Sequence, residues 1–288
     1  MTATQQDEID LLAADIADFR DRHDLREVVV IDVSSTEPLP PYHPGFEDDA
    51  LLQAALTTPG VRVLPPSSRA ALAAIAAGAA YAAFTPSASL NLPVLRARAE
   101  RAGIAYAGQD GKTGETLLRT VLAPMFAARG FRVQSWAGTN LLGGGDGATL
   151  ADPEAVRSKL VSKNRGLHAL VGDDVVAPLH IDNVPDLGDV KTAWDHVSAT
   201  GFLGSRVTLQ TTWSAYDSAL AAPLVIDLVR SLSLATRAGH AGVVPALGCF
   251  FKDPWGSDVH GFGEQTALFV AWVHETAAAV AAARVAAP

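Results

Sequence analysis

The sequence predicts an α/β fold built on a parallel sheet. Short apolar segments alternate with helical segments over residues 6–108, and this alternation is typical of parallel strands joined by helices. Of the 288 residues, 49% are hydrophobic and only 18% are charged, which is enough apolar material for one large core or two modest domains. From residue 131 the sequence pattern changes to a long strand-like segment followed by a glycine loop.

In the first half, apolar spacing distinguishes the expected helices from the expected strands. The expected helices lie at 6–23, 67–79, 91–102 and 117–130. The expected strands lie at 28–35, 81–86 and 104–108. The proline-rich segment PLPPYHPG at 38–45 is expected to be a loop.

The second half is expected to begin with a strand at 131–140 and a glycine loop at 141–147. A helix at 151–166 follows, and a turn then carries Asp189 and Lys191. A further strand from residue 207 leads through Asp217 into a long helix, and residues 262–285 are expected to form a C-terminal helix.

Charge and composition exclude several classes of protein. The net charge of −9 and a pI near 5.3 argue against a general nucleic-acid binder, which normally presents a basic face. No segment approaches the ~18 consecutive apolar residues of a membrane span, and the first residues do not form a secretory signal. The single cysteine, Cys249, lies in apolar LGCFF, where a small buried side chain is expected rather than a nucleophile. One cysteine suits a reducing cytoplasm, where we expect the protein to act.

Metal and hydrolase motifs are not indicated. The eight histidines show neither H-E-x-x-H nor paired Cys/His spacing, so no metal site is expected. His180 and Asp182 are two apart on an expected strand, but the sequence indicates no third ligand. No G-x-S-x-G segment marks a serine hydrolase.

Small polar residues follow the three strands of the predicted parallel sheet. They are Ser34, Ser35 and Thr36 after the first strand, Thr85, Pro86 and Ser87 after the second, and Gly108 to Thr113 after the third. Ligands of parallel sheets sit at the carboxyl ends of the strands. We therefore expect a ligand site there.

The segment AYAGQDGKTGET at 105–116 contains Gly-Lys-Thr and raises the question of a nucleotide P-loop. A P-loop needs a glycine five residues before the Gly of Gly-Lys-Thr, and that position holds Tyr106. The segment is therefore interpreted as a strand-to-helix turn. Backbone N–H groups at the helix start, with the Thr113 hydroxyl, would suit an anion. Capping of the helix by Asp110 or Thr113 is the alternative.

Lysine is rare, and its placement is informative. Only five of the 22 Lys and Arg residues are lysine, and each lies beside Gly, Asp, Ser or Pro rather than in the arginine-bearing helices. An ammonium is a compact donor whose pKa falls on burial, which arginine does not imitate. We therefore expect at least three of the five to serve one site. The five are Lys112, Lys159, Lys163, Lys191 and Lys252.

For the Lys159/Lys163 pair and for Asp217, the sequence leaves a second interpretation open. Lys159 and Lys163 are four residues apart and share one helix face, where a common anionic ligand would explain two like charges. A solvated helix face is the other interpretation. Asp217 likewise either faces the site or caps the helix that follows it.

From Ser34 onward, these elements resemble the myo-inositol-1-phosphate synthase (inositol-3-phosphate synthase) family. The resemblance covers roughly residues 8–275. It is carried by DVSSTEP, YAAFTPS, AGQDGKTGETLLRTVLAPMF, GTNLLGGGDG, RSKLVSK, NVPDLGDVKTAWDH, YDSALAAPLVIDL and FFKDP. Several of these motifs are specific to the family.

The resemblance implies a Rossmann-type domain interrupted by an α+β domain. Residues 1–116 and 221–288 are expected to form a partial Rossmann-type sheet, and residues 117–220 the inserted catalytic and tetramerisation domain. The implied reaction converts D-glucose 6-phosphate into 1D-myo-inositol 3-phosphate, with NAD used and regenerated. C5 is oxidised, C6 is enolised and attacks the C1 aldehyde, and the ketone is reduced again. Ammonium groups would stabilise oxyanions, relay protons and hold the phosphate.

The family's site residues carry over position by position as implied roles. The implied catalytic positions are Lys159, Lys191, Lys252, Asp146 and Asp189. The implied phosphate ligands are Lys163 and Thr113. The positions implied to line the cofactor are Ser34, Ser35, Thr36, Thr85, Asp110, Thr113, Gly144, Gly145, Asp146, Asp189, Asp217 and Ser218. Lys112 lies in the same motif, but no catalytic role is expected for it.

The sequence departs from the family pattern at three places. No G-x-G-x-x-G follows any strand, so the cradle that would hold the NAD pyrophosphate is absent from this chain. Asp32 stands where relatives usually have Asn, and Gly144 and Gly145 stand where others often carry Asn.

Three hypotheses about function follow from this gap. The chain is an inositol-phosphate synthase whose front portion comes from elsewhere, or a redox-neutral aldolase or isomerase on a phosphosugar or cyclitol phosphate. The third is a non-catalytic paralogue that joins a complete synthase. A parallel sheet without its first strands has an unpaired edge and uncovered apolar faces. We therefore expect a homo-oligomer, such as the tetramer that the resemblance implies, or a companion chain, and neither nucleic acid nor membrane as a partner.

Overall fold

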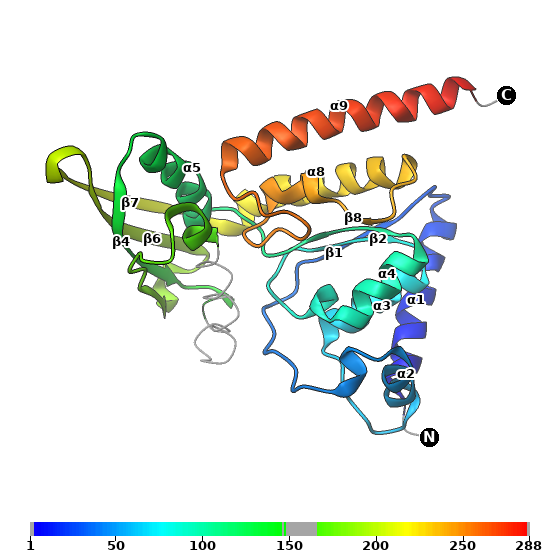
Figure 1. Cartoon of the computed structure of the whole chain (residues 1–288). Coiled ribbons are helices and arrows are strands. Elements are labelled where there is room, and N and C mark those ends of the chain that lie inside the picture. Colours follow the sequence, from blue (N-terminus) through cyan, green and yellow to red (C-terminus); the bar gives the residue numbers. More distant parts are fainter. Residues whose placement is uncertain (1–2, 146, 148–165, 287–288) are drawn as a thin grey trace.

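Two sheets organise the chain (Figure 1). The computed structural model describes residues 3–145, 147 and 166–286. The first sheet is parallel, in the order β1-β2-β3-β8, and consists of β1 (Val29–Asp32), β2 (Ala80–Ala83), β3 (Ala105–Gly108) and β8 (Gly242–Val243). The second sheet is mixed, in the order β5-β4-β6-β7, and consists of β5 (Leu179–Asn183), β4 (Arg132–Leu142), β6 (Val190–Thr200) and β7 (Arg206–Tyr216).

Helices cover both faces of the parallel sheet because its short strands are apolar on both sides. One face, with Tyr81 and Tyr106, packs against α1 (Gln5–Arg22), α2 (Asp49–Thr57), α3 (Pro66–Ala76) and α4 (Pro93–Ala102). The opposite face packs against α8 (Asp217–Arg237) and α9 (Phe262–Ala286). Leu228 and Leu232 of α8 are fully buried there. Each such leucine contributes about 1.5–3 kcal/mol to folding.

The second sheet has a separate core beneath α5 (Glu115–Ala128). Trp136 of β4, at 1% exposure, packs edge-on against Phe126 of α5. The backbone leaves the parallel sheet through α5 and returns from β7 directly into α8. The second sheet therefore faces the carboxyl ends of β1, β2 and β3 (Figure 1).

The predicted fold class is confirmed, since the chain has a parallel α/β sheet and a second sheet. The helices expected at 6–23, 67–79, 91–102, 117–130 and 262–285 correspond to α1, α3, α4, α5 and α9 within a few residues. The first strand was predicted too long: β1 ends at Asp32, so Ser34 and Ser35 follow the strand. Of the helix expected at 151–166, residues 151–165 lie outside the described residues. The division at 116/117 and 220/221 stays a prediction.

Two described helices, α8 and α9, are long and apolar enough by length and composition to cross a membrane. The buried share of their most apolar window is 22% for α8 and 6% for α9. One or two such helices are weak evidence, because the core helix of a globular protein passes the same test. Since α8 packs on the parallel sheet, the absence of a membrane partner stays the prediction.

Candidate active site

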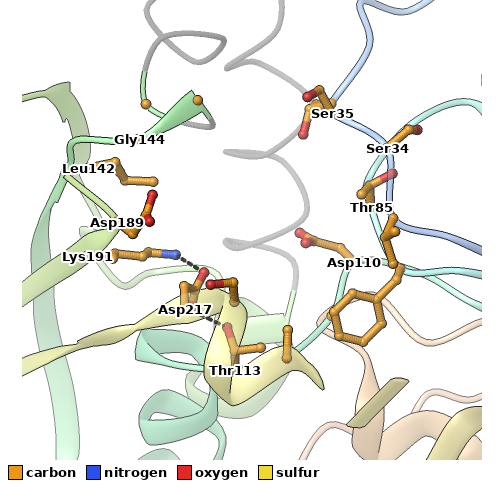
Figure 2. Close-up of a pocket in the computed structure, with 18 of the residues that line it drawn as sticks. Ser34, Ser35, Thr85, Asp110, Thr113, Leu142, Gly144, Asp189, Lys191 and Asp217 are labelled. Carbon is orange, nitrogen blue, oxygen red and sulfur yellow. Dashed lines mark hydrogen bonds and ion pairs between the residues drawn. The ribbon is translucent and has the colours of Figure 1, made fainter. Parts of the chain in front are cut away.

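An open cleft of about 350 Å³ lies between the carboxyl ends of β1, β2 and β3 and the second sheet. Figure 2 shows Ser34, Thr85 and Asp110 on one side of the cleft and Asp189 and Lys191 on the other. The residues of the sequence-predicted site that line it are Ser34, Ser35, Thr36, Thr85, Asp110, Thr113, Gly144, Gly145, Asp189, Lys191, Asp217, Ser218 and Lys252. The structure thus brings together every predicted site residue that it describes. The roles of these residues remain predictions.

Lys252 and Asp110 form a buried ion pair at this cleft. Lys252 Nζ lies 2.7 Å from Asp110 Oδ1, and the two residues are 7% and 3% exposed. The backbone sets this geometry, because the Lys252 N–H donates to the Asp110 carbonyl at 2.7 Å. Gly111 makes an antiparallel bridge to Phe251. A Cβ at Gly111 would lie 2.2 Å from the Phe84 ring, so glycine is required for this close approach.

A second ammonium–carboxylate pair joins the two halves of the cleft. Lys191 Nζ, on β6, lies 3.1 Å from Asp217 Oδ2 at the start of α8, and the Thr113 hydroxyl donates to Asp217 Oδ1 at 2.6 Å. Burial opposes the charge on Asp217, but the Lys191 ammonium and the Thr113 hydroxyl outweigh it and lower the pKa of Asp217 to about 2. Asp217 is therefore ionised at neutral pH. It holds Lys191 and Thr113 toward the cleft.

The alternative that Asp110, Thr113 or Asp217 caps a helix is wrong. The N-cap of α5 is Gly114, which makes no side-chain cap bond, while Asp110 and Thr113 bind Lys252 and Asp217. The N-cap of α8 is Tyr216, again without a side-chain cap bond. Asp217 therefore faces the cleft and does not cap α8.

The first turn of α5 keeps the features of an anion site. The first four N–H groups of a helix have no intrahelical partner, and Gly114 supplies no side-chain acceptor for them. Thr113, just before this turn, lines the cleft, whereas the buried Thr116 does not. The Glu115 carboxylate is engaged by Arg119 and by Asn140 Nδ2, the latter at 2.6 Å. Glu115 therefore does not cap the helix, and the helix dipole at this end favours an anion.

Asp32, the last residue of β1, organises the hydroxyl groups beside it. Its Oδ1 accepts from the Ser34 N–H at 3.0 Å and the Ser34 hydroxyl at 2.6 Å, and its Oδ2 accepts from the Tyr81 hydroxyl at 3.3 Å. Burial, and then the Asp32 charge, raise the pKa of Tyr81 well above its ordinary value. Because the Ser34 proton is directed at Asp32, its oxygen is left to accept from a ligand.

The glycine loop after β4 packs on the turn that precedes β6. A Cβ at Gly143 would lie 2.5 Å from the Gly188 nitrogen, and one at Gly144 would lie 3.0 Å from Asp189 Oδ1. This close approach places the loop and Asp189 along one wall of the cleft. Asn at position 144, which the family pattern often shows, would need the Asp189 side chain to shift.

The prediction that at least three of the five lysines serve one site is not tested. Asp146, Lys159 and Lys163 lie outside the described residues. Lys112 is buried and does not line the cleft. Two of the three lysines that the structure describes therefore meet there. Within the described ranges, no group of three or more His, Cys, Asp and Glu side chains is placed to hold a metal ion.

One buried polar cluster was not singled out from the sequence. Arg119 of α5 contacts Glu115 one turn earlier and Asp195 of β6, with 3.0 Å between Arg119 Nη2 and Asp195 Oδ1. Asp195 also accepts from Trp136 Nε1 at 2.8 Å. The spacing of Glu115 and Arg119, four residues apart, was the only sequence signal. The cluster fixes the first turn of α5 on the second sheet.

Fold and site together define an α/β protein with a polar, ion-paired ligand cleft at the carboxyl edge of its parallel sheet. The sequence model of the family described as myo-inositol-1-phosphate synthase, an NAD-binding family, matches residues 1–274. The chain belongs to this family.

Curated relatives agree with this assignment. Inositol-3-phosphate synthase 1 of Bacteroides thetaiotaomicron is 33% identical over 280 residues, covering 94% of this chain and 64% of that protein. Inositol-3-phosphate synthase of Drosophila melanogaster is 32% identical over 248 residues, covering 81% of this chain and 43% of that protein. The chain therefore spans less than two thirds of the length of these relatives.

Among solved structures, inositol-3-phosphate synthase of Caenorhabditis elegans superposes with a TM-score of 0.85 at 24% identity. The superposition covers 96% of this chain and 58% of that one. A myo-inositol-1-phosphate synthase-related protein of Thermotoga maritima gives a TM-score of 0.72 at 24% identity. At this identity the likeness supports the shared fold.

Proposed function

We propose that this chain supplies the sugar-phosphate and proton-handling part of an inositol-3-phosphate synthase-type active site. The substrate is D-glucose 6-phosphate and the product is 1D-myo-inositol 3-phosphate. The observation that carries the proposal is the meeting of two ammonium–carboxylate pairs, Lys252–Asp110 and Lys191–Asp217, in one cleft beside the uncapped start of α5. Such a cleft offers donors for developing oxyanions and a separate place for a phosphate.

The phosphate is proposed to bind at the first turn of α5. The helix N–H groups offer donors there, and Thr113, which the family pattern implies as a phosphate ligand, lines the cleft beside them. The charged side chains that line the described cleft are Lys191, Lys252, Asp110, Asp189 and Asp217, which sum to −1. A phosphate therefore needs further positive charge. Lys163, the phosphate ligand that the family pattern implies, is proposed to supply it.

The two described lysines are proposed to act on the reacting oxygens. Lys191, held by Asp217, donates to the oxyanion that forms beside it, and Lys252, held by Asp110, handles a proton in the enolisation. Each carboxylate orients its ammonium before the substrate arrives, so little reorganisation is needed at the transition state. Lys159, Asp146 and Asp189 are proposed to complete the set.

NAD would supply hydride transfer at the sugar carbon that is oxidised and reduced. The described residues fit it only in part. Ser34 and Thr85 offer hydroxyl groups at the strand ends, but none of the described parallel strands is followed by G-x-G-x-x-G. The turn after β3, which leads into α5, is the one proposed to hold the substrate phosphate. The cofactor therefore enters the proposal only for an assembled synthase.

The same observation favours a second candidate function. A cleft with paired lysines and no described pyrophosphate cradle would serve a redox-neutral aldolase or isomerase acting on a phosphosugar or cyclitol phosphate. This candidate requires turnover without NAD. The synthase proposal requires that turnover occur only when two things are added: NAD, and a polypeptide that carries the G-x-G-x-x-G turn for the NAD pyrophosphate. A non-catalytic role in a complete synthase predicts turnover under neither condition.

Titration calorimetry tests the substrate proposal directly. Glucose 6-phosphate and inorganic phosphate are expected to bind, glucose to bind much more weakly, and NAD not to bind the chain alone. Thr113→Val is expected to weaken phosphate binding because Thr113 lines the cleft, whereas Thr120→Val, within α5, leaves it unchanged because that hydroxyl donates to the Leu117 carbonyl. Equal phosphate affinity in the two variants would contradict the proposed phosphate position.

Association with further polypeptide is also proposed. β1 is the terminal strand of the parallel sheet in the described chain, and an apolar groove of about 310 Å³, lined by Leu12, Ile16, Phe19, Val28 and Val30, lies beside it. Unpaired strand edges next to apolar surface favour association. Light scattering is expected to show an oligomer, or a monomer that binds a companion chain. A soluble monomer without any partner at micromolar concentration contradicts this.

A further inference from the structure

Lys112 is a buried lysine that the proposed chemistry does not use. It is 3% exposed, and its Nζ donates to Gln265 Oε1 in the first turn of α9. The ammonium also lies 5.5 Å from the centre of the Phe262 ring. Among the described carboxylates none forms an ion pair with it. A buried ammonium held only by neutral groups is costly, so its retention calls for a reason beyond packing.

On the α9 side, the contacts of Lys112 extend into the segment that enters the helix. Gln265 is 3% exposed, and its Nε2 donates to the Val259 carbonyl at 2.7 Å. The Gln265 N–H donates to the Gly261 carbonyl at 2.9 Å. One glutamine therefore connects the Lys112 ammonium to residues 259–265. The start of α9 is fixed relative to the turn that carries Lys112.

On the cleft side, the backbone of the same turn is bonded to the segment that carries Lys252. The Lys112 N–H donates to the Phe250 carbonyl at 2.9 Å. The neighbouring Asp110 carbonyl accepts from the Lys252 N–H. Asp110 and Thr113, on either side of Lys112, hold Lys252 and Asp217 through their side chains. A shift of this turn would therefore move both ion pairs of the cleft together.

We propose that Lys112 is a positioning residue: its ammonium anchors the 109–114 turn to the first turn of α9 and thereby sets the geometry of both ion pairs. Lys112 does not touch the cleft, so it acts through Asp110 and Thr113. Burial lowers the pKa of Lys112 to about 8, with the Cys249 thiol as a smaller opposing influence. At neutral pH the ammonium form still predominates. The effect of Lys112 on substrate binding rests on the proposed function, whereas its effect on the position of the 109–114 turn does not.

The test compares Lys112→Met with a matched loss of a buried polar anchor elsewhere. Gln5 is 1% exposed and bonds the backbone of Val63 and Leu64 from α1, far from the cleft, so Gln5→Leu is the control. Both variants are expected to unfold at lower urea concentration. In Lys112→Met, amide hydrogen exchange at 109–114 and 250–253 is expected to accelerate roughly tenfold relative to Gln5→Leu. The dissociation constant for inorganic phosphate is expected to rise by a similar factor.

Equal exchange rates at 109–114 and 250–253 in the two variants overturn the proposal. Amide exchange does not depend on turnover, so this readout decides the role of Lys112 even if the wild-type chain binds no phosphate and the proposed function fails. If Lys112→Met does not fold, Phe262→Leu is measured in its place. It keeps an apolar side chain but removes the ring face below the ammonium. Faster exchange in the same two segments supports the anchor, and unchanged exchange overturns it.

Discussion

Asp195 is a buried acid whose protonation is expected to control how stability depends on pH. It is 2% exposed and shares the Arg119 guanidinium with Glu115. Burial, and then the negative charge of Glu115, raise the pKa of Asp195 from 3.8 to about 6, although Arg119 and Trp136 oppose the shift. At a pH between these two pKa values, Asp195 is therefore protonated in the folded protein but ionised in the unfolded chain.

The sign and size of the effect follow from this difference. Between about pH 4 and pH 6 the folded state binds more protons than the unfolded state, so the free energy of unfolding falls as pH rises. A shift of about two pKa units at 1.36 kcal/mol each gives a loss of about 3 kcal/mol across this window. Asp195→Asn removes the titration. Asn keeps the shape of the protonated acid and an oxygen that accepts from Trp136 Nε1.

Urea unfolding of both proteins from about pH 4 to pH 7 measures the effect. The stability of Asp195→Asn relative to wild type is expected to rise by about 3 kcal/mol over this range. Asp174→Asn, whose side chain is 91% exposed, is the control and is expected to follow wild type within about 0.5 kcal/mol. A flat difference for Asp195→Asn, or one of opposite sign, refutes the reasoning.

Three other outcomes are expected from single changes. In an assembled synthase, Lys191→Met and Lys252→Met each lower kcat by about 10²–10³, the effect of losing one transition-state donor, as measured by inositol phosphate formation. Retention of wild-type kcat contradicts the proposed roles. Gly111→Ala destabilises by about 1–3 kcal/mol because its Cβ would meet the Phe84 ring at 2.2 Å, whereas Gly263→Ala, with open space around it, is neutral or stabilising in urea. Equal losses contradict this contrast. Burial raises the pKa of Cys249 to about 11, so a thiol reagent at pH 8 reacts slowly with the native chain and quickly in urea. Rapid native labelling contradicts it.

The parallel sheet was predictable because its signal is local. The β2 segment AYAA and the β3 segment AYAG are buried on both faces, so each appears in the sequence as a short apolar run. α2 was not predicted, because its nine residues show only two buried positions, Leu52 and Leu56, and its start depends on Asp48 accepting from two N–H groups. Such a short helix is stabilised by tertiary packing more than by its own sequence.

The cleft was predictable as a set of residues but not as a set of pairs. Polar residues after successive parallel strands must meet at one edge of the sheet, which is why Ser34, Thr85 and Asp110 lie together. Nothing local indicates that Asp110 pairs with Lys252, which is 142 residues away. This pair depends on the backbone contact between the turn after β3 and residues 250–253, and the Lys191–Asp217 pair depends on how β6 lies against the start of α8. Pattern and propensity within one segment do not encode that arrangement.

Lys112 and Lys191 show why a lowered pKa alone does not identify a catalytic amine. Lys112 has a pKa lowered to about 8 by burial, yet it faces α9 and not the cleft. Lys191 lines the cleft, and its Nζ lies 3.1 Å from the carboxylate of Asp217, whose pKa of about 2 keeps that carboxylate ionised. A charged, oriented amine stabilises an oxyanion better than it abstracts a proton. Position in the cleft, supported by a paired acid, is therefore the stronger criterion for assigning Lys191 to the chemistry.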